Sequence, residues 1–454
     1  MLKRIPALVS AALVAALALG GAFAPYRPAA AQSNKISLIR DAETENIIRA
    51  YATPLFQAAG LNPEDVRIHL VNDRSLNAFV AGGQRLFINT GLILQSRHSG
   101  QLIGVIAHEI GHISGGHLAK MEDELRRASA QQILAMIIGG AVAIGTGRGD
   151  AGGAVMMGGA STAMRGFLDF TRTQESAADA AALQFLDQTQ QSAQGLLEFM
   201  QVLEKQDPRS PDRQDPYLRT HPLSRERVEV LRQHVAASPY SAAPPAELLE
   251  RMHGRMHAKL FAFLNPLGHT LRQYPERDQS LVARYARAIA YYRAPQLDRA
   301  LVLIDALIRE HPDDPYFNEL KGQMLFENGR VADAVAPYEK AVRLLPESGL
   351  LKGDLARVQI ETQDPALLES AIAHLNTALR EDRAQPFYWR QLAIAHGRRG
   401  EMAESSLALA EEAMLLNRKE EARFHAGRAE TLLPRGSPGW LKAQDILEAV
   451  RVKK

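Results

Sequence analysis

The sequence predicts a mixed α+β domain followed by an all-α array of helical repeats. Strand candidates occur only in the first half of the chain, where they are mixed with helices. After about Ser241 the apolar pattern is continuously helical, and a unit of about 34 residues recurs. A chain of 454 residues is long enough for two or three domains. We therefore expect a first domain over residues 34–240, a helical linker over 241–280 and the repeats over 281–454.

The composition is that of a globular protein that has no disulfide bonds. Hydrophobic residues make up 46% and charged residues 23% of the chain, which argues against extensive disorder. The formal net charge of +2 gives no field strong enough to attract nucleic acid, so we expect no nucleic-acid partner. Because the chain has no cysteine, its own core must stabilise it, and any zinc ligands must be histidines and carboxylates.

The N-terminus has the layout of a secretory signal peptide. Two basic residues precede an apolar run over residues 5–24, and three alanines follow at 29–31. We expect cleavage after Ala31, which removes residues 1–31 and leaves the rest of the chain exported. The alternative is an uncleaved membrane anchor, because the run is about long enough to span a tilted bilayer.

The first elements of the α+β domain follow from the periodicity of apolar residues. Helical spacing predicts a first helix over residues 36–51. Residues 67–71 (RIHLV) and 85–89 (RLFIN) are typical of short strands, and NAFVAGG at 77–83 predicts a strand and turn between them. The next helix is expected to begin near Ser99.

Three later segments complete the domain. Residues 133–164 are apolar but interrupted by glycines, and the initial run 133–143 is too short to span a bilayer. This segment is either a mobile helical hairpin that makes peripheral membrane or client contact, or a buried helix pair whose glycines allow close packing. Residues 174–188 predict an alanine-rich helix, and residues 207–222 a polar loop punctuated by prolines.

The second half of the chain has the period of tetratricopeptide repeats. Pro312 and Pro346 are 34 residues apart, and turns at Gly329 and Gly400 are 71 residues apart, about two repeats. Each helix–turn–helix unit leaves an apolar face that only stacking covers, so we expect a superhelix with a concave binding surface. The alternative is an irregular helical bundle.

The motif HEIGH places two histidines and a glutamate where they can serve one metal ion. His108 and His112 are four residues apart, so on a helix both imidazoles project from one face. Both ring nitrogens can then reach a single zinc ion, with Glu109 beside a water molecule. The preceding apolar helix, GQLIGVIA, is expected to bury the motif, and buried histidines need such a partner.

Zinc requires a third ligand from the protein, and two residues are candidates. His117 is nine residues after His108, so in a continuing helix it points away, and we interpret it as a polar or capping residue. Glu175 is the better candidate, because Asp179 follows one turn later and can hydrogen-bond the far nitrogen of a ligand histidine. The alternative is two solvated acids at a helix start.

These motifs together resemble a known peptidase family. HEIGH, then QESAAD about 63 residues later, then THPLSRER resemble the zinc peptidases related to HtpX and the CAAX prenyl protease, over residues 36–234. With the N-terminal leader and the repeats, the whole chain is similar to the BepA-like periplasmic chaperone–proteases. The resemblance implies an α+β domain of the gluzincin type, followed by the repeat superhelix.

The resemblance also implies roles for individual residues. Those that would bind one Zn²⁺ per chain are His108, His112 and Glu175. Those that would act on or beside the reacting groups are Glu109 as general base, His221 near the metal, Asp179 behind a ligand histidine, and Arg227. Residues 77–81 would form the edge strand that binds substrate. His221 is expected either to stabilise the oxyanion or to be a fourth zinc ligand that excludes water.

The implied function is that of a periplasmic zinc metalloendopeptidase acting in quality control and assembly of outer-membrane and other envelope proteins. Its substrates would be misfolded or stalled envelope proteins, and its repeats would recruit clients or the outer-membrane assembly machinery. The alternative function is that of a mainly non-proteolytic assembly chaperone with a latent zinc site.

Overall fold

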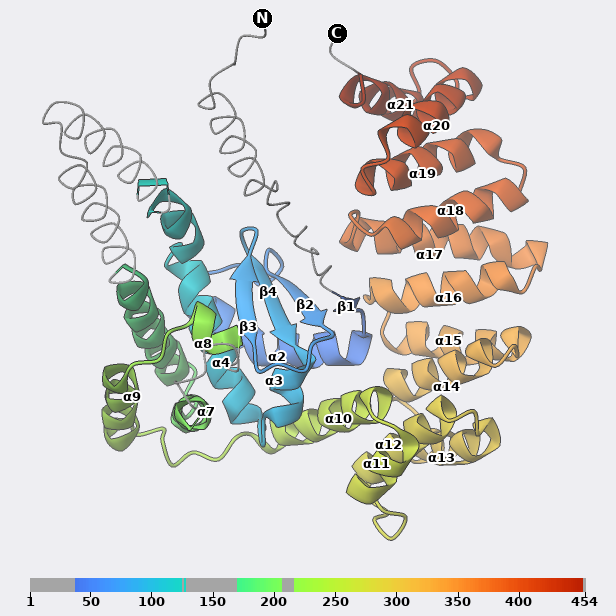
Figure 1. Cartoon of the computed structure of the whole chain (residues 1–454). Helices are drawn as coiled ribbons and strands as arrows, with labels where there is room; N and C mark the ends of the chain where they lie inside the picture. Colours follow the sequence, from blue (N-terminus) through green and yellow to red (C-terminus); the bar gives the residue numbers. More distant parts are fainter. Residues whose placement is uncertain (1–36, 125, 128–169, 206–215, 452–454) are drawn as a thin grey trace, which may run out of the picture. The chain divides into compact units, whose positions relative to one another are not determined.

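The computed structural model describes residues 37–124, 126–127, 170–205 and 216–451 (Figure 1). The expected signal peptide, the glycine-rich segment 133–164 and the first part of the expected loop 207–222 lie outside the described residues. From Leu38 onward the described residues form one compact unit. None of the described helices is both long enough and apolar enough to cross a membrane.

A four-stranded sheet forms the centre of the first domain, with the strand order β1-β2-β4-β3. The strands are β1 (Leu38–Ile39), β2 (Arg67–Val71), β3 (Ala78–Ala81) and β4 (Arg85–Asn89). β2 and β4 are parallel, whereas β1 and β3 pair antiparallel to their neighbours. The three strands expected from the sequence are confirmed. β3 lies at an edge of the sheet, as the edge-strand expectation requires.

The first helix begins later than the sequence predicts, and a short strand precedes it. α2 (Ala42–Ala58) follows Asp41, whose carboxylate accepts a 2.7 Å hydrogen bond from the backbone N–H of Thr44. This cap fixes the start of the helix. The residues before Asp41 are therefore free to pair with β2 as β1. A strand of two residues is too short for periodicity to reveal.

Helices pack around the sheet and build the first hydrophobic core. They are α3 (Thr90–Gln95), α4 (Ser99–Ser114), an unlabelled helix over residues 170–188, α7 (Gln194–Glu204), α8 (Pro216–Thr220) and α9 (Arg225–Ala237). The helices expected from Ser99 and over residues 174–188 are confirmed. The expected loop over 207–222 is partly wrong, because α8 lies within it. Pro216 suits the first helical position, where its missing N–H has no helical partner.

Close contact between α4 and α7 depends on glycines from both helices. A Cβ atom on Gly104 would lie 2.7 Å from Leu196 Cβ, and one on Gly195 would lie 2.3 Å from the backbone of Gly100. No larger residue fits at either position without moving a helix backbone. This contact fixes α4, which carries the HEIGH motif, inside the core.

The second half of the described chain is all helical, as predicted, and contains no strand. Its helices are α10 (Glu247–Leu264), α11 (Leu267–Gln273), α12 (Leu281–Arg293), α13 (Leu297–Glu310), α14 (Pro315–Glu327), α15 (Val331–Leu344), α16 (Gly349–Glu361), α17 (Leu368–Glu381), α18 (Pro386–Arg398), α19 (Met402–Leu415), α20 (Lys419–Leu432) and α21 (Pro438–Ala449), with a 3₁₀ turn at Pro365–Leu367. Gly329 and Gly400 form the predicted turns, with φ of +78° and +79°. Successive helices stack in order, so the array is a superhelix of helical pairs (Figure 1).

α10 belongs to two hydrophobic cores at once. Met256 and Leu260 pack in the core of the first domain. Ala258 and Ala262, on another face of the same helix, pack with α12 and its neighbours in the second core. The two cores are therefore joined through one continuous helix.

Candidate metal centre

Helix α4 presents both histidines of HEIGH to the same point in the core. The Nε2 atoms of His108 and His112 are 3.1 Å apart. His108 is fully buried and His112 is nearly so. Gly111, between them, allows the helix over residues 170–188 to lie against α4, because a Cβ there would be 2.7 Å from Ala178 O. The glycine of HEIGH thus brings a second helix to the histidine pair.

That second helix supplies Glu175, whose carboxylate faces both histidines. Its Oε2 lies 3.3 Å from His108 Nε2 and its Oε1 lies 3.4 Å from His112 Nε2. Burial alone would raise the pKa of Glu175, but hydrogen bonds from the histidines outweigh it and hold the pKa far below its usual range. Glu175 and Asp179 are both buried, so they are not two solvated acids at a helix start.

Asp179, itself held by Arg227, contacts the ring nitrogen of His108 that faces away from the cluster. Asp179 Oδ1 lies 2.9 Å from His108 Nδ1. Arg227 donates from Nε to Asp179 Oδ2 at 2.6 Å and from Nη2 to Oδ1 at 2.9 Å, and its Nη1 lies 3.0 Å from Glu175 Oε2. Such a two-pronged pair fixes both partners in orientation. Burial lowers the pKa of His108, but Asp179 and Glu175 outweigh it and raise the pKa to about 10.

His221 completes the cluster from the end of α8. Its Nδ1 lies 3.1 Å from Glu175 Oε1, and its Nε2 lies 3.5 Å from Glu109 Oε1. The ring of His221 stacks on Tyr217, with centroids 4.4 Å apart and planes inclined by 29°. One donor atom each from His108, His112, Glu175 and His221 all lie within 4.8 Å of one another.

Glu109 is fully buried beside this cluster. Neither of its carboxylate oxygens accepts a hydrogen bond from any described residue. Burial raises the pKa of Glu109, although His221 and His108 oppose this. A buried carboxylate without a hydrogen-bond partner implies a missing group, such as a water molecule or an ion.

The donor set fits a metal ion. Imidazole nitrogens with one carboxylate are ligands that zinc and other first-row metals accept. Burial lowers the pKa of His112 to about 4. The structure therefore brings together every site residue that the sequence singled out.

The prediction that His117 points away from the histidine pair is wrong. It assumed that α4 continues, whereas the helix ends at Ser114 and the chain turns at Gly115 and Gly116. His117 Nδ1 consequently lies 3.0 Å from His112 Nδ1. The Gly-Gly pair was the available signal, because glycine commonly follows the last residue of a helix.

A cavity of about 520 Å³ opens beside the cluster. Its lining combines His112, Glu175 and His221 with apolar side chains from β3 and from the helical residues that follow Gly116, namely Phe79, Val80, Leu118 and Met121. Leu118, Met121 and Tyr217 belong to no motif, so the sequence did not single them out. The edge strand therefore borders the metal-binding groups.

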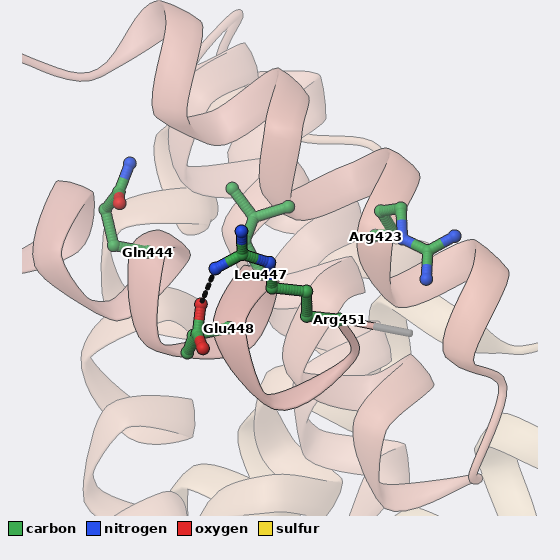
Figure 2. A pocket seen from close by; sticks show the side chains of 5 residues that line it. All are labelled: Arg423, Gln444, Leu447, Glu448 and Arg451. Carbon is green, nitrogen blue, oxygen red and sulfur yellow. Dashed lines mark hydrogen bonds and ion pairs between the residues drawn. The ribbon is translucent and has the colours of Figure 1, made fainter. Parts of the chain in front are cut away.

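A second hollow, of about 440 Å³, lies at the last repeat and has no comparable chemistry (Figure 2). Its two cationic side chains have partners, since Arg423 donates to Val450 O at 2.7 Å and Arg451 lies 3.3 Å from Glu448. No metal-binding cluster is found there among the described residues.

A helix that buries HEIGH, with a carboxylate from a second helix facing both histidines, defines the class of metal-dependent peptidases. The comparisons agree: residues 39–235 match the model of peptidase family M48, and residues 285–348 match a tetratricopeptide repeat. Residues 39–235 are thus similar to the peptidases of family M48, and residues 285–348 are similar to tetratricopeptide repeats.

The similar curated proteins extend over both parts. The chain is 26% identical over 381 residues to the beta-barrel assembly-enhancing protease of Yersinia pestis, covering 82% of this chain and 77% of that protein. It is 24% identical over 404 residues to the protein of the same name from Escherichia coli (strain K12), covering 88% and 81%. Among solved structures, YrrB, a tetratricopeptide-repeat protein, is similar with a TM-score of 0.30 and 16% identity, covering 41% of this chain and 93% of that one.

Proposed function

We propose that this chain is a zinc-dependent endopeptidase of the periplasm that acts in the quality control and assembly of outer-membrane and other envelope proteins. The observation that carries the proposal is the buried cluster of His108, His112, Glu175 and His221 beside the carboxylate of Glu109, which accepts no hydrogen bond from a described residue. The name of the similar curated proteins, beta-barrel assembly-enhancing protease, supports the choice of client class. The leader over residues 1–31 supports the location.

One Zn²⁺ per chain would be held by His108, His112 and Glu175. A bound zinc ion supplies Lewis acidity, which polarises a carbonyl group and lowers the pKa of water to about 7. Asp179 keeps His108 in the tautomer that leaves Nε2 free to bind, and Arg227 holds Asp179 and Glu175 in place.

Glu109 is the general base in this proposal. It has two buried oxygens that accept no hydrogen bond from a described residue, so one of them is free to take a proton from water. The same oxygen then passes that proton to the nitrogen of the leaving amine. Burial raises the pKa of Glu109 toward the working pH, which makes both transfers easier.

The outer edge of β3 is the proposed binding site for the substrate backbone. Within the described residues β3 pairs only with β4, and its residues Phe79 and Val80 line the cavity next to His112. An extended peptide added along this edge would be held by main-chain hydrogen bonds, with little dependence on sequence. Such binding suits misfolded or stalled proteins, whose backbones are exposed.

The repeats are proposed to recruit clients or the outer-membrane assembly machinery. Stacked tetratricopeptide units present a concave surface of the kind that binds other proteins. Peripheral membrane contact through residues 133–164 remains part of the proposal on sequence grounds alone.

A latent assembly chaperone is the second candidate, and the position of His221 favours it. Three ligands leave one zinc position for water, and His221 Nδ1 lies 3.1 Å from Glu175, close enough to take that position. In this state the site holds its metal and is closed to substrate.

We expect metal removal to abolish cleavage of an unfolded reporter protein. Treatment with 1,10-phenanthroline should remove one zinc per chain, and added Zn²⁺ should restore cleavage where Mg²⁺ does not, because imidazole ligands disfavour Mg²⁺. Elemental analysis gives the stoichiometry and a fluorogenic unfolded substrate gives the rate. Full activity in a chain shown to be free of metal would refute the proposed function.

Replacing His221 with alanine should separate the two roles of that residue. We expect zinc to be retained and cleavage, including self-cleavage, to rise, because the position that His221 closes becomes open to water. A matched control is His234→Ala, which removes a histidine of α9 that lies 3.2 Å from Asp187, outside the cluster. A fall in turnover with zinc retained would instead assign His221 to the oxyanion.

A further inference from the structure

His117 lies directly behind His112, on the side away from the cluster. The Nδ1 atoms of the two rings are 3.0 Å apart, and the rings meet edge to face with centroids 4.9 Å apart. His117 is 6% exposed. The other nitrogen of His112, Nε2, faces His108 and Glu175. His112 is therefore in contact through both of its ring nitrogens.

The backbone after α4 is shaped to place His117 there. The N–H of Gly116 donates to Ile113 O at 3.0 Å, and Gly116 has φ of +61°, a conformation that favours glycine. A Cβ atom on Gly115 would lie 2.3 Å from His117 Nε2, so the imidazole lies over Gly115. The two glycines interrupt the helix, and the missing side chain of Gly115 makes room for the ring.

The contact between two Nδ1 atoms restricts the tautomers of both rings. A hydrogen bond needs one donor and one acceptor, so only one Nδ1 carries a proton. If His112 binds a metal through Nε2, its proton must be on Nδ1, and that N–H then donates to Nδ1 of His117. His117 in turn carries its proton on Nε2. No charge change is required for this arrangement.

We propose that His117 is a positioning residue that fixes the tautomer and ring orientation of His112 for metal binding. The proposal rests on the proposed role of His112 as a zinc ligand. Metal-binding histidines usually donate their second ring N–H to a fixed acceptor. His108 has such an acceptor in Asp179, at 2.9 Å, and His117 gives His112 the equivalent acceptor.

The test compares variants that remove or keep the acceptor. His117→Ala removes it, whereas in His117→Asn the side-chain oxygen takes nearly the position of Nδ1. We expect the alanine variant to bind Zn²⁺ about 10- to 100-fold more weakly, and the asparagine variant to stay within about threefold of wild type. Leu118→Ala is the matched control, because it alters the same cavity and leaves His117 in place. Affinity is measured on the full chain by competition with a chromogenic chelator.

Two further measurements keep the proposal open to refutation. Nitrogen-15 NMR of the zinc-loaded wild type should show His112 protonated at Nδ1, and a proton on Nε2 would overturn the proposal. A folded His117→Ala chain with wild-type zinc affinity would also overturn it. If the alanine variant does not fold, His117→Phe, which keeps the bulk and lacks an acceptor, takes its place. A wild-type chain that binds no zinc would instead refute the proposed function itself.

Discussion

Replacing Glu109 with glutamine is expected to lower the rate of peptide hydrolysis by about 10²- to 10⁴-fold, the usual contribution of a general base. Glutamine has nearly the same shape as glutamate but accepts no proton at neutral pH. Because neither oxygen of Glu109 accepts a hydrogen bond from a described residue, the substitution breaks no such bond in the core. The fold and a zinc content near one per chain should therefore be retained.

Glu175→Gln is the matched control for this experiment. It makes the same chemical change one helix away, on a carboxylate that lies 3.3 Å and 3.4 Å from the two histidines. We expect this variant to lose zinc as well as activity. Zinc loss in Glu109→Gln, or near-normal hydrolysis with its zinc retained, would show that Glu109 is not the base. Unchanged zinc in Glu175→Gln would show that Glu175 is not a ligand.

Local sequence spacing was sufficient to predict the histidine pair of the site but not its surroundings. His108 and His112 share a helix face whatever the rest of the fold does, so their spacing alone indicated a shared target. The position of Glu175 depends on a second helix packing against Gly111, which no local pattern encodes. Glu175 was predicted as a ligand because zinc requires a third ligand from the protein and because of the family resemblance.

The errors have similarly local causes. His117 was misplaced because a continuing helix was assumed, although Gly115 and Gly116 gave a stop signal. The strand at Leu38–Ile39 was missed because two residues show no period. Tyr217 could not be recognised, because its stacking on His221 depends on the short helix α8.

The least predictable feature is a buried network of charges that joins α2, α10 and the first repeats. Its centre is Lys259 on α10, which is 3% exposed. Lys259 Nζ lies 2.5 Å from Asp41 Oδ2 and 3.3 Å from Glu43 Oε2. Arg255 Nη2 lies 2.7 Å from Glu43 Oε1, and the hydroxyl of Tyr285 on α12 donates a hydrogen bond to Glu43 Oε2 at 2.7 Å. A lone lysine in an amphipathic helix gives no hint of such partners.

Replacing Lys259 with methionine is expected to destabilise the chain by about 3–5 kcal/mol, the usual cost of removing one partner from a buried ion pair. Methionine fills much of the space but leaves the carboxylates of Asp41 and Glu43 buried with one cation fewer. Burial lowers the pKa of Lys259, but these carboxylates outweigh it and hold the pKa well above its usual range. The lysine is therefore charged in the folded chain, and its charge is what the variant loses.

The network links α2 to Tyr285 of α12, and Lys259 Nζ also lies 3.7 Å from Glu319 Oε2 of α14. We therefore expect Lys259→Met to separate the unfolding of the first domain from that of the repeats. The chain has 2 tryptophans, Trp389 and Trp440, and both lie in the repeats, so their fluorescence reports unfolding of the array alone. Release of zinc to a chromogenic chelator reports unfolding of the first domain, which carries the proposed zinc ligands. In urea the two signals should change together in the wild type and at different concentrations in the variant.

Two further variants decide whether charge is the cause. Lys442→Met makes the same change at an exposed position of α21 and should leave both midpoints within about 0.5 kcal/mol of wild type. Adding Asp41→Asn to Lys259→Met removes one uncompensated charge, and asparagine can still cap α2 by accepting from the Thr44 N–H. The double variant should therefore recover part of the lost stability. If it is no more stable than Lys259→Met, lost packing rather than buried charge accounts for the effect, and the role given to the network is wrong.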